Sequence, residues 1–197
     1  MKQFLNLWIK LFFVFTPFFG LTIFLSMTEG YDTTRRRKLA LIASAAVAVI
    51  CLVLFWAGRW IFSMLGISLD SFRVGAGVLL FLSGIALVHG RAGTADITLD
   101  DTTAVVPLAM PIVVGPATTG TLLVMGAELN NATGKLVGCV SLLFAVVCVA
   151  AILFMSGYIH SILGRRGISI LSKLTGLVLT ALAAQMIMTG VRGFFGL

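Results

Sequence analysis

The residues best suited to bind a solute lie at two proline- and glycine-rich breaks in otherwise apolar segments, about 94 residues apart. The first break reads Thr-Pro-Phe-Phe-Gly over residues 16–20, and the second reads Met-Pro-Ile-Val-Val-Gly-Pro over residues 110–116. Proline removes a backbone donor and disturbs the preceding helical turn, so carbonyl groups are left free for another partner. Matched breaks in the two halves of a membrane chain are the best sequence indication of a transporter's binding site.

The chemistry available at these breaks suits a small zwitterion. A helix N-terminus carries partial positive charge, so the amides near Gly20 and near residues 115–119 are suited to a carboxylate. Free carbonyls and threonine hydroxyls are suited to a cation. Gln185, about midway along the last apolar segment, either binds the same solute or bridges helices. The candidate solute-binding residues are Thr16, Pro17, Gly20, Thr22, Pro111, Gly115, Pro116, Thr118, Thr119 and Gln185.

Acid–base and metal chemistry find little support in the sequence. All seven acidic residues fall in loops or at segment ends, which disfavours a proton carried on an intramembrane carboxylate. His89 and His160 have no second ligand at helical spacing, so we expect neither a metal site nor a cofactor. The sequence has no HExxH, no GxSxG and no intramembrane acid pair, which argues against an enzyme. Coupling to Na⁺ or H⁺ stays open.

The composition indicates an integral membrane protein. Of 197 residues, 59% are hydrophobic and 11% are charged, and the mean hydropathy is +1.11. A helix needs roughly 20 apolar residues to cross a bilayer, and the short linkers leave no room for a soluble domain. We therefore expect one all-α transmembrane domain over residues 1–197, surrounded by the lipid bilayer. The six predicted spans are 11–28, 39–57, 73–90, 104–126, 136–157 and 172–194.

The net charge of +7 comes from basic residues at the span ends. They form no basic stripe with interleaved aromatic residues, so we expect no nucleic-acid partner. Lys and Arg in short loops are retained in the cytoplasm, so we expect the more basic side of the predicted topology to face the cytoplasm. Both termini then lie on the other side, in the periplasm. The more basic side holds Arg35, Arg36, Arg37, Lys38, Arg91, Arg165, Arg166 and Lys173, whereas the other side holds Lys2, Lys10, Arg59, Arg73, Lys135 and Arg192.

An internal repeat relates the two halves. Residues 58–68 are similar to residues 157–169, and both stretches are followed at equal spacing by Ser71 and Ser172, then by Gly75 and Gly176. Each unit, about 1–90 and about 104–197, then holds three helices, and an odd number of crossings inverts the second unit relative to the first. Inverted repeats are typical of secondary transporters. The alternative is that duplication only builds a stable bundle.

Arg73 and Lys173 open the third and sixth predicted spans at near-equivalent places in the repeat. Their ordinary role is snorkelling, with the charge held at headgroup level. The functional alternative is gating, in which each closes one end of the pathway by pairing with a helix C-terminus or with a carboxylate such as Asp70.

Small residues recur at four-residue spacing in three segments and let helix backbones approach closely. We expect intramolecular packing faces, with a seam between copies of a homo-oligomer as the alternative. These residues are Ala40, Ser44 and Ala48, then Gly134 and Gly138, then Gly176, Thr180 and Ala184.

Four stretches resemble the MarC family of bacterial inner-membrane proteins, in the family's order and over nearly the whole chain. They are residues 16–28, 66–77, 106–116 and 173–176, the last followed by Gln185 and Gly190. The resemblance implies a six-helix protein of the bacterial inner membrane, in the LysE-like superfamily that contains small amino-acid exporters. Family members are linked to transport of small neutral amino acids.

Two departures from the family's pattern mean that substrate choice is not carried over. Thr16 stands where the family usually has asparagine, and Thr22 stands where it usually has a second proline. We expect a secondary transporter or exporter of small neutral solutes, above all amino acids, that works by alternating access. The alternative is a membrane protein of structural or regulatory role without transport activity.

Overall fold

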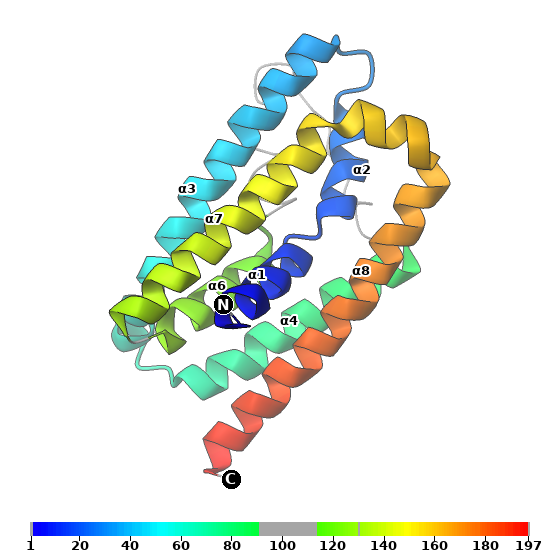
Figure 1. The fold of residues 1–197 in the computed structure, drawn as a ribbon. Helices are drawn as coiled ribbons and strands as arrows, with labels where there is room; N and C mark the ends of the chain where they lie inside the picture. Colours follow the sequence, from blue (N-terminus) through cyan, green and yellow to red (C-terminus); the bar gives the residue numbers. More distant parts are fainter. Residues whose placement is uncertain (1, 91–113, 130, 197) are drawn as a thin grey trace.

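The computed structural model describes residues 2–90, 114–129 and 131–196, and within these ranges the chain is helical with no strand. Five segments are long and apolar enough to cross a membrane, when the first two helices are counted as one segment. The all-α membrane fold is therefore confirmed. The helices are α1 (Lys2–Val14), α2 (Pro17–Met27), α3 (Thr33–Leu65), α4 (Leu69–His89), α6 (Pro116–Glu128), α7 (Ala132–Phe154) and α8 (Ser156–Phe195) (Figure 1).

Polar caps and left-handed glycines set several helix ends. The Asp32 carboxylate accepts the amide of Thr34 at the start of α3, and the Ser68 hydroxyl accepts the amide of Ser71 at the start of α4. α3 ends at Gly66, which has φ 64°. Gly164 also has a positive φ of 61°, but its ψ of 177° is extended, unlike the 19° of Gly66, and it marks a kink within α8. A positive φ strongly favours glycine, so these two positions fix where each long helix turns.

The four long helices pair in antiparallel fashion. α3 runs against α7, since Arg37 lies over the ring of Phe154 near one end and Lys135 lies over the ring of Trp56 near the other. α4 runs against α8, because Gly84 meets Gly176 while the later α8 residue Gly190 meets the start of α4 at Asp70. α6 packs on α3 and α4, and α2 packs on α8 (Figure 1).

Most of the predicted small residues pack inside the molecule, although Ala184 is exposed. A Cβ on Gly84 would lie 2.9 Å from the Gly176 carbonyl oxygen, and a Cβ on Gly176 would lie 2.8 Å from the Gly84 carbonyl oxygen. Thr180 also contacts Gly84, while Gly138 packs against Phe55. These contacts make α4 and α8 approach backbone to backbone, as small residues allow in lipid.

The hydrophobic core surrounds the first break. One buried cluster includes Leu11, Phe15 and Phe24 and extends to α3 and α7, and a second joins Val14 to α4, α6 and α8 through residues such as Ala117. Core packing thus reaches the break from both sides, which holds an irregular backbone inside the bundle where lipid cannot reach it.

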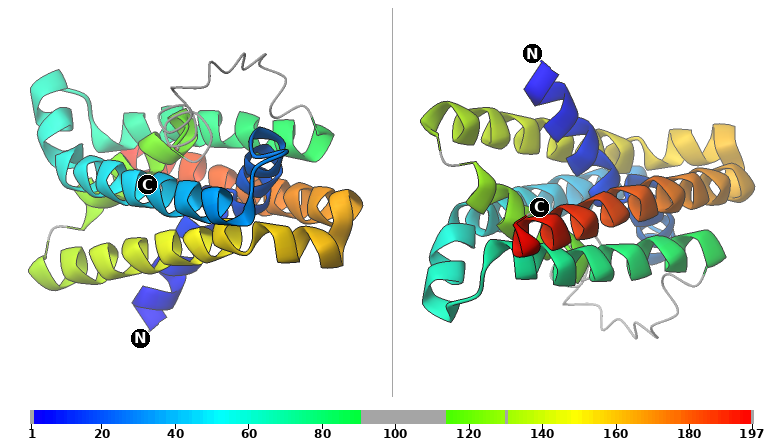
Figure 2. Two further views of the ribbon diagram at one scale, coloured as in Figure 1. Left: turned by 90° about the horizontal axis from the view of Figure 1, so that it is seen from above. Right: turned by 90° about the horizontal axis from the view of Figure 1, so that it is seen from below.

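The predicted span 11–28 is not one straight helix. Its first part belongs to α1, which begins nine residues earlier and lies steeply inclined to the long helices, with its N-terminal end projecting from the bundle (Figure 2). The proline break allows this change of direction, which apolar length alone does not predict. The last predicted span is also longer, since α8 turns at a kink at Gly164 and the helix after the kink begins at Arg165, seven residues before the predicted start at 172. The first part of the predicted span 104–126 lies outside the described residues, and α6 forms its remainder.

Candidate functional site

The first break is centred on Thr16. This residue caps α2 with a left-handed backbone (φ 47°, ψ 56°), and its side chain makes no capping hydrogen bond. Its amide donates to the carbonyl of Phe13 at 3.0 Å, and its own carbonyl accepts the amide of Gly20 at 2.9 Å. Pro17 occupies the first helical position, where its missing N–H costs nothing. The predicted interruption of the first span is therefore confirmed.

The second break begins a helix beside the first one. Gly115 caps α6 and Pro116 is its first residue, so the same proline device starts both half-helices. The buried Thr118 hydroxyl donates to the Val14 carbonyl at a distance of 3.4 Å. Ala117 packs with Val14 in the same buried cluster. The two breaks, far apart in the sequence, thus meet inside the bundle.

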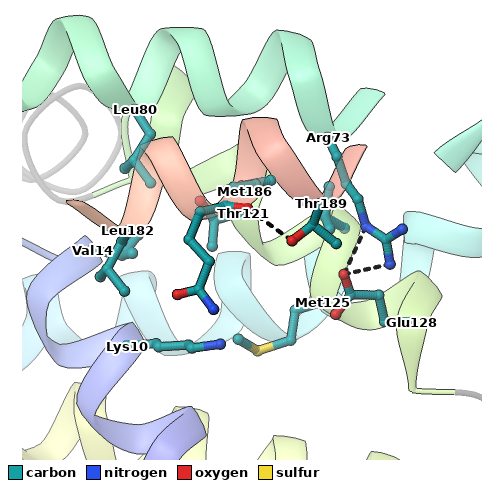
Figure 3. Close-up of a pocket in the computed structure, with 12 residues that line it drawn as sticks. Lys10, Val14, Arg73, Leu80, Thr121, Met125, Glu128, Leu182, Met186 and Thr189 are labelled. Atoms are coloured by element: carbon teal, nitrogen blue, oxygen red, sulfur yellow. Dashed lines mark hydrogen bonds and ion pairs between the residues drawn. The ribbon is translucent and has the colours of Figure 1, made fainter. Parts of the chain in front are cut away.

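A cavity of about 210 Å³ opens beside this meeting point, and we call it the central cavity (Figure 3). Helices α1, α4, α6 and α8 each contribute to its wall. Figure 3 shows the Lys10 side chain reaching across one side, while Arg73 and Glu128 lie together on another. Its lining residues are Lys10, Val14, Arg73, Leu80, Thr121, Val124, Met125, Glu128, Leu182, Gln185, Met186 and Thr189.

An ion-pair cluster bounds one end of the central cavity. The Nε and Nη2 atoms of Arg73 both donate to Glu128 Oε1, at 2.9 and 2.7 Å, and Nη1 binds the Asp70 carboxylate. The Arg73 side chain is 17% exposed, whereas that of Glu128 is 41% exposed. Because Arg73 belongs to α4 and Glu128 ends α6, the cluster ties these two helices together. Asp70 is the carboxylate named in the gating alternative for Arg73, but it lies three residues away on the same helix, so gating stays a prediction.

The hydroxyls of the central cavity serve as acceptors. Thr121 donates its proton to the Ala117 carbonyl at 2.9 Å, and Thr189 donates to the Gln185 carbonyl at 2.8 Å. Their oxygen atoms can therefore still accept hydrogen bonds, and the Gln185 amide adds a donor and an acceptor. Together with the Lys10 ammonium and the Glu128 carboxylate, the wall can bind both charges of a zwitterion.

The predicted site residues do not all gather at one place. Arg73 and Gln185 line the central cavity, and Thr118 lies beside it. Pro116 and Thr119 line a different, mostly apolar hollow between α4 and α6. Pro111 lies outside the described residues.

Three further predicted residues lie away from the central cavity. Pro17 and Gly20 are buried at the start of α2. Thr22 donates its hydroxyl to the Phe18 carbonyl at 3.0 Å and lines a second cavity, near the loop that joins α2 to α3. Lys173 is exposed on α8 and forms no ion pair with any residue that the structure describes, unlike Arg73.

Sequence reasoning missed the charged residues Lys10 and Glu128 of the central cavity, as well as its hydroxyl residues Thr121 and Thr189. Lys10 was grouped with the basic residues at span ends, although it stands alone in an apolar stretch. A charge inside a membrane segment is a functional indication by default. Glu128 sits at the end of α6, and only the folded chain shows that this end reaches Arg73.

Comparison with known proteins agrees with the membrane fold. The profile described as MarC family integral membrane protein matches residues 1–195. A UPF0056 membrane protein of Pyrococcus abyssi is 32% identical, and the match covers 100% of this chain and 98% of that protein. The UPF0056 membrane protein YhcE of Escherichia coli is 28% identical, over 95% of this chain and 91% of its own. No solved structure matches the chain.

Proposed function

The chain belongs to the MarC family of integral membrane proteins, and we propose that it is a secondary transporter or exporter of small neutral solutes, above all amino acids. The observation that carries this proposal is the central cavity, where exposed side chains of both charges, Lys10 and Glu128, line a space between α1, α4, α6 and α8 that opens to the surface. Lys10 stands within the apolar sequence of α1, and a charged residue in such a segment is typical of solute and ion pathways.

The charges in the central cavity fit the two ends of an amino acid. The Lys10 ammonium and the Gln185 amide bind the solute carboxylate, and Glu128 binds its ammonium group. The apolar wall from Val14, Leu80 and other residues leaves room for a small side chain. A neutral solute then enters without adding net charge to the bundle.

The size of the central cavity favours a small solute. Its volume of about 210 Å³ holds roughly seven water molecules at ~30 Å³ each. Pockets for drug-sized ligands start at about 300 Å³. A single amino acid with a short side chain is the class that fits best.

Alternating access is supported by the position of two cavities at opposite ends of the bundle. The central cavity is lined by α8 residues from Leu182 onward, and the second cavity by α8 residues up to Ile168. At 1.5 Å per helical residue the two are about 20 Å apart, and Val14, at the meeting of the breaks, lines the central cavity. The antiparallel pairs α3–α7 and α4–α8 support an inverted repeat. In this proposal the Arg73–Glu128 cluster is a gate at the end of the central cavity.

We propose an inner-membrane location with the Arg35–Lys38 end in the cytoplasm. The α7–α8 turn brings Arg165 to the same end, where it faces Glu29 at 3.6 Å. Lys and Arg accumulate on the cytoplasmic side of membrane proteins. The end of α8 with Arg192 then lies in the periplasm, and the N-terminus is assigned to the same side from the loop charges.

Counterflow of labelled alanine, serine and glycine in proteoliposomes tests the proposal. We expect uptake driven by internal unlabelled solute, with Lys10→Met and Gln185→Leu each raising KM about tenfold or more, as expected for loss of a charge-assisted contact. Lys2→Met is the matched control, since Lys2 is on the same helix and outside the cavity. Imposed Na⁺ and proton gradients identify the coupling ion. Absence of counterflow for every small zwitterion would reject transport and favour a structural or regulatory role.

A further inference from the structure

The second cavity, near the loop that joins α2 to α3, is basic and lies at the cytoplasmic end of the proposed topology. From here on we call it the Arg36 cavity. Its volume is about 480 Å³, and its polar wall comes from the end of α2, the start of α3 and the first turns of α8. Ser26, Glu29, Arg36, His160 and Arg165 supply that wall. It is separate from the central cavity, with which it shares no lining residue.

Arg36 is held in place by one hydrogen bond, which leaves most of its five N–H donors without an acceptor among the described residues. Its Nη2 donates to the Thr28 carbonyl at 3.0 Å, which satisfies the C-terminal end of α2. Its Nη1 lies on the side of Gly157, where an added Cβ would stand 3.7 Å away. The Nε is buried and has no hydrogen-bond partner among the described residues. Because Nε is enclosed, a ligand in the cavity reaches Arg36 through Nη1, which lies beside the cavity-lining residue Gly157.

The charges around Arg36 select an anion. Arg165, 84% exposed, has Glu29 as its nearest carboxylate, at 3.6 Å and 75% exposed, so this pair is loose. Two guanidinium groups and the His160 ring thus face a single carboxylate. A guanidinium group binds phosphate oxygens through two parallel N–H donors, and arginine is therefore more frequent than lysine in sites of this geometry.

The surroundings of the Arg36 cavity are those of the headgroup region. The Arg35 guanidinium lies 4.3 Å from the ring centre of Tyr31 and makes a cation–π contact with it. Tyr158 and Ile162 are 63% and 64% exposed on the α8 turns beside it. Tyrosines at the membrane interface and basic pockets on the cytoplasmic side accompany sites for anionic lipid headgroups.

We propose that the Arg36 cavity binds a phosphate ester through Arg36, Arg165 and His160. The phosphate comes from an anionic phospholipid headgroup or from a soluble phosphate ester, and the chemistry at the guanidinium groups is the same. This inference does not rest on transport, because binding is measured without a gradient or a transported solute.

Binding to delipidated, detergent-purified protein tests this assignment by calorimetry with three probes. Dioctanoylphosphatidylglycerol carries a lipid phosphate, glycerol 3-phosphate carries a soluble one, and dioctanoylglycerol has the same chains as the lipid without phosphate. We expect saturable binding of at least one phosphate probe, with Arg165→Gln weakening it at least about fivefold. Arg36→Gln, which keeps an amide donor for Thr28, weakens it similarly. Binding of the lipid alone assigns the site to a headgroup, and binding of both assigns it to the phosphate itself.

Arg166→Gln is the matched control, because it removes the same charge from the next residue, which is exposed and outside the cavity wall. We expect its affinity to stay within about twofold of the unmodified protein, as screening reduces distant surface charges. The proposal is overturned by equal weakening in Arg165→Gln and Arg166→Gln, by unchanged affinity in both cavity variants, or by equally tight binding of dioctanoylglycerol. Arg165 is largely exposed, so its variant keeps the fold even where Arg36→Gln does not.

Discussion

The Thr118 hydroxyl donates to the Val14 carbonyl across 104 positions of sequence. Val14 ends α1 just before the first break, and Thr118 lies in the first turn of α6 after the second. A carbonyl at the end of one interrupted helix is thereby satisfied by a residue at the start of another. The two breaks therefore support one another, which is how irregular backbone is tolerated at membrane depth.

Thr118→Val is expected to destabilise the fold by about 0.5–1 kcal/mol, because valine keeps the shape and loses the donor to Val14. Interhelical hydrogen bonds in membrane proteins average about 0.6 kcal/mol, and this one is long at 3.4 Å. Thermal unfolding in detergent measures the difference. Thr118→Ser keeps the hydroxyl and should retain most of the stability. A serine variant as unstable as the valine variant would show that the methyl group matters instead.

Thr16→Asn is expected to stabilise the protein by about 1 kcal/mol. Thr16 is the only non-glycine residue with positive φ among those the structure describes, and a β-branched residue is unfavourable there, whereas asparagine tolerates it. The Thr16 side chain makes no capping bond that would be lost. Thr16→Val keeps the branched Cβ and should give no gain. Equal unfolding temperatures for the asparagine and valine variants would contradict the strain argument.

The breaks and helix starts were predictable because they rest on local chemistry. Proline fixes its own φ and lacks the amide donor, whereas glycine tolerates backbone conformations that other residues avoid, so the Thr16–Pro17 break and the Gly115–Pro116 helix start follow from residue type. The apolar run lengths likewise predict the long helices. The small-residue spacing indicates close packing, and the contact of Gly84 with Gly176 identifies the partner helix.

The central cavity was less predictable because it depends on where the elements meet. Lys10 faces it only because α1 turns away from the line of α2, and apolar length does not encode that direction. Arg73 and Lys173 occupy similar places in the repeat. Arg73 finds Glu128 at the end of α6, whereas Lys173 stays exposed. Tertiary neighbours thus distinguish two residues that local sequence treats alike.

A double-mutant cycle on Arg73 and Glu128 is expected to give a coupling energy of about 1 kcal/mol. Two guanidinium nitrogens meet one carboxylate oxygen, but Glu128 is partly exposed, which weakens the pair. The variants are Arg73→Gln, Glu128→Gln and the double change, compared by unfolding in detergent. Lys173→Gln should change stability by less than about 0.5 kcal/mol. Additive effects of the two single changes would show that the observed contact stabilises nothing.

The extra stability that Asp32 gives the protein at the start of α3, compared with asparagine at this position, should depend on pH. Hydrogen bonds from the Thr34 and Thr33 backbone amides hold the pKa of the Asp32 carboxyl below its ordinary value of 3.8. A lowered folded-state pKa gives stability that is fully present above 3.8 and is lost as the pH falls through the folded value. The difference in unfolding temperature between the protein and Asp32→Asn should be equal at pH 7 and pH 5 and smaller at pH 3. A difference that grows on acidification would contradict this sign.

Gly84→Ala is expected to destabilise the protein by about 1–3 kcal/mol, whereas Gly75→Ala on the same helix should not. A Cβ on Gly84 would lie 2.7 Å from Thr180 Cγ2, 2.9 Å from the Gly176 carbonyl oxygen and 3.0 Å from the Thr180 amide nitrogen. Two of these three atoms are backbone, so α4 and α8 must separate, which costs energy in a packed core. A Cβ on Gly75 has nothing within 4 Å, and alanine there should gain about 0.5–1 kcal/mol from helix propensity.

Unfolding in detergent, with size-exclusion chromatography of each variant, separates a packing loss within one chain from a change in oligomeric state. Loss of a dimer in Gly84→Ala without loss of chain stability would move this seam from the inside of the molecule to an interface between copies.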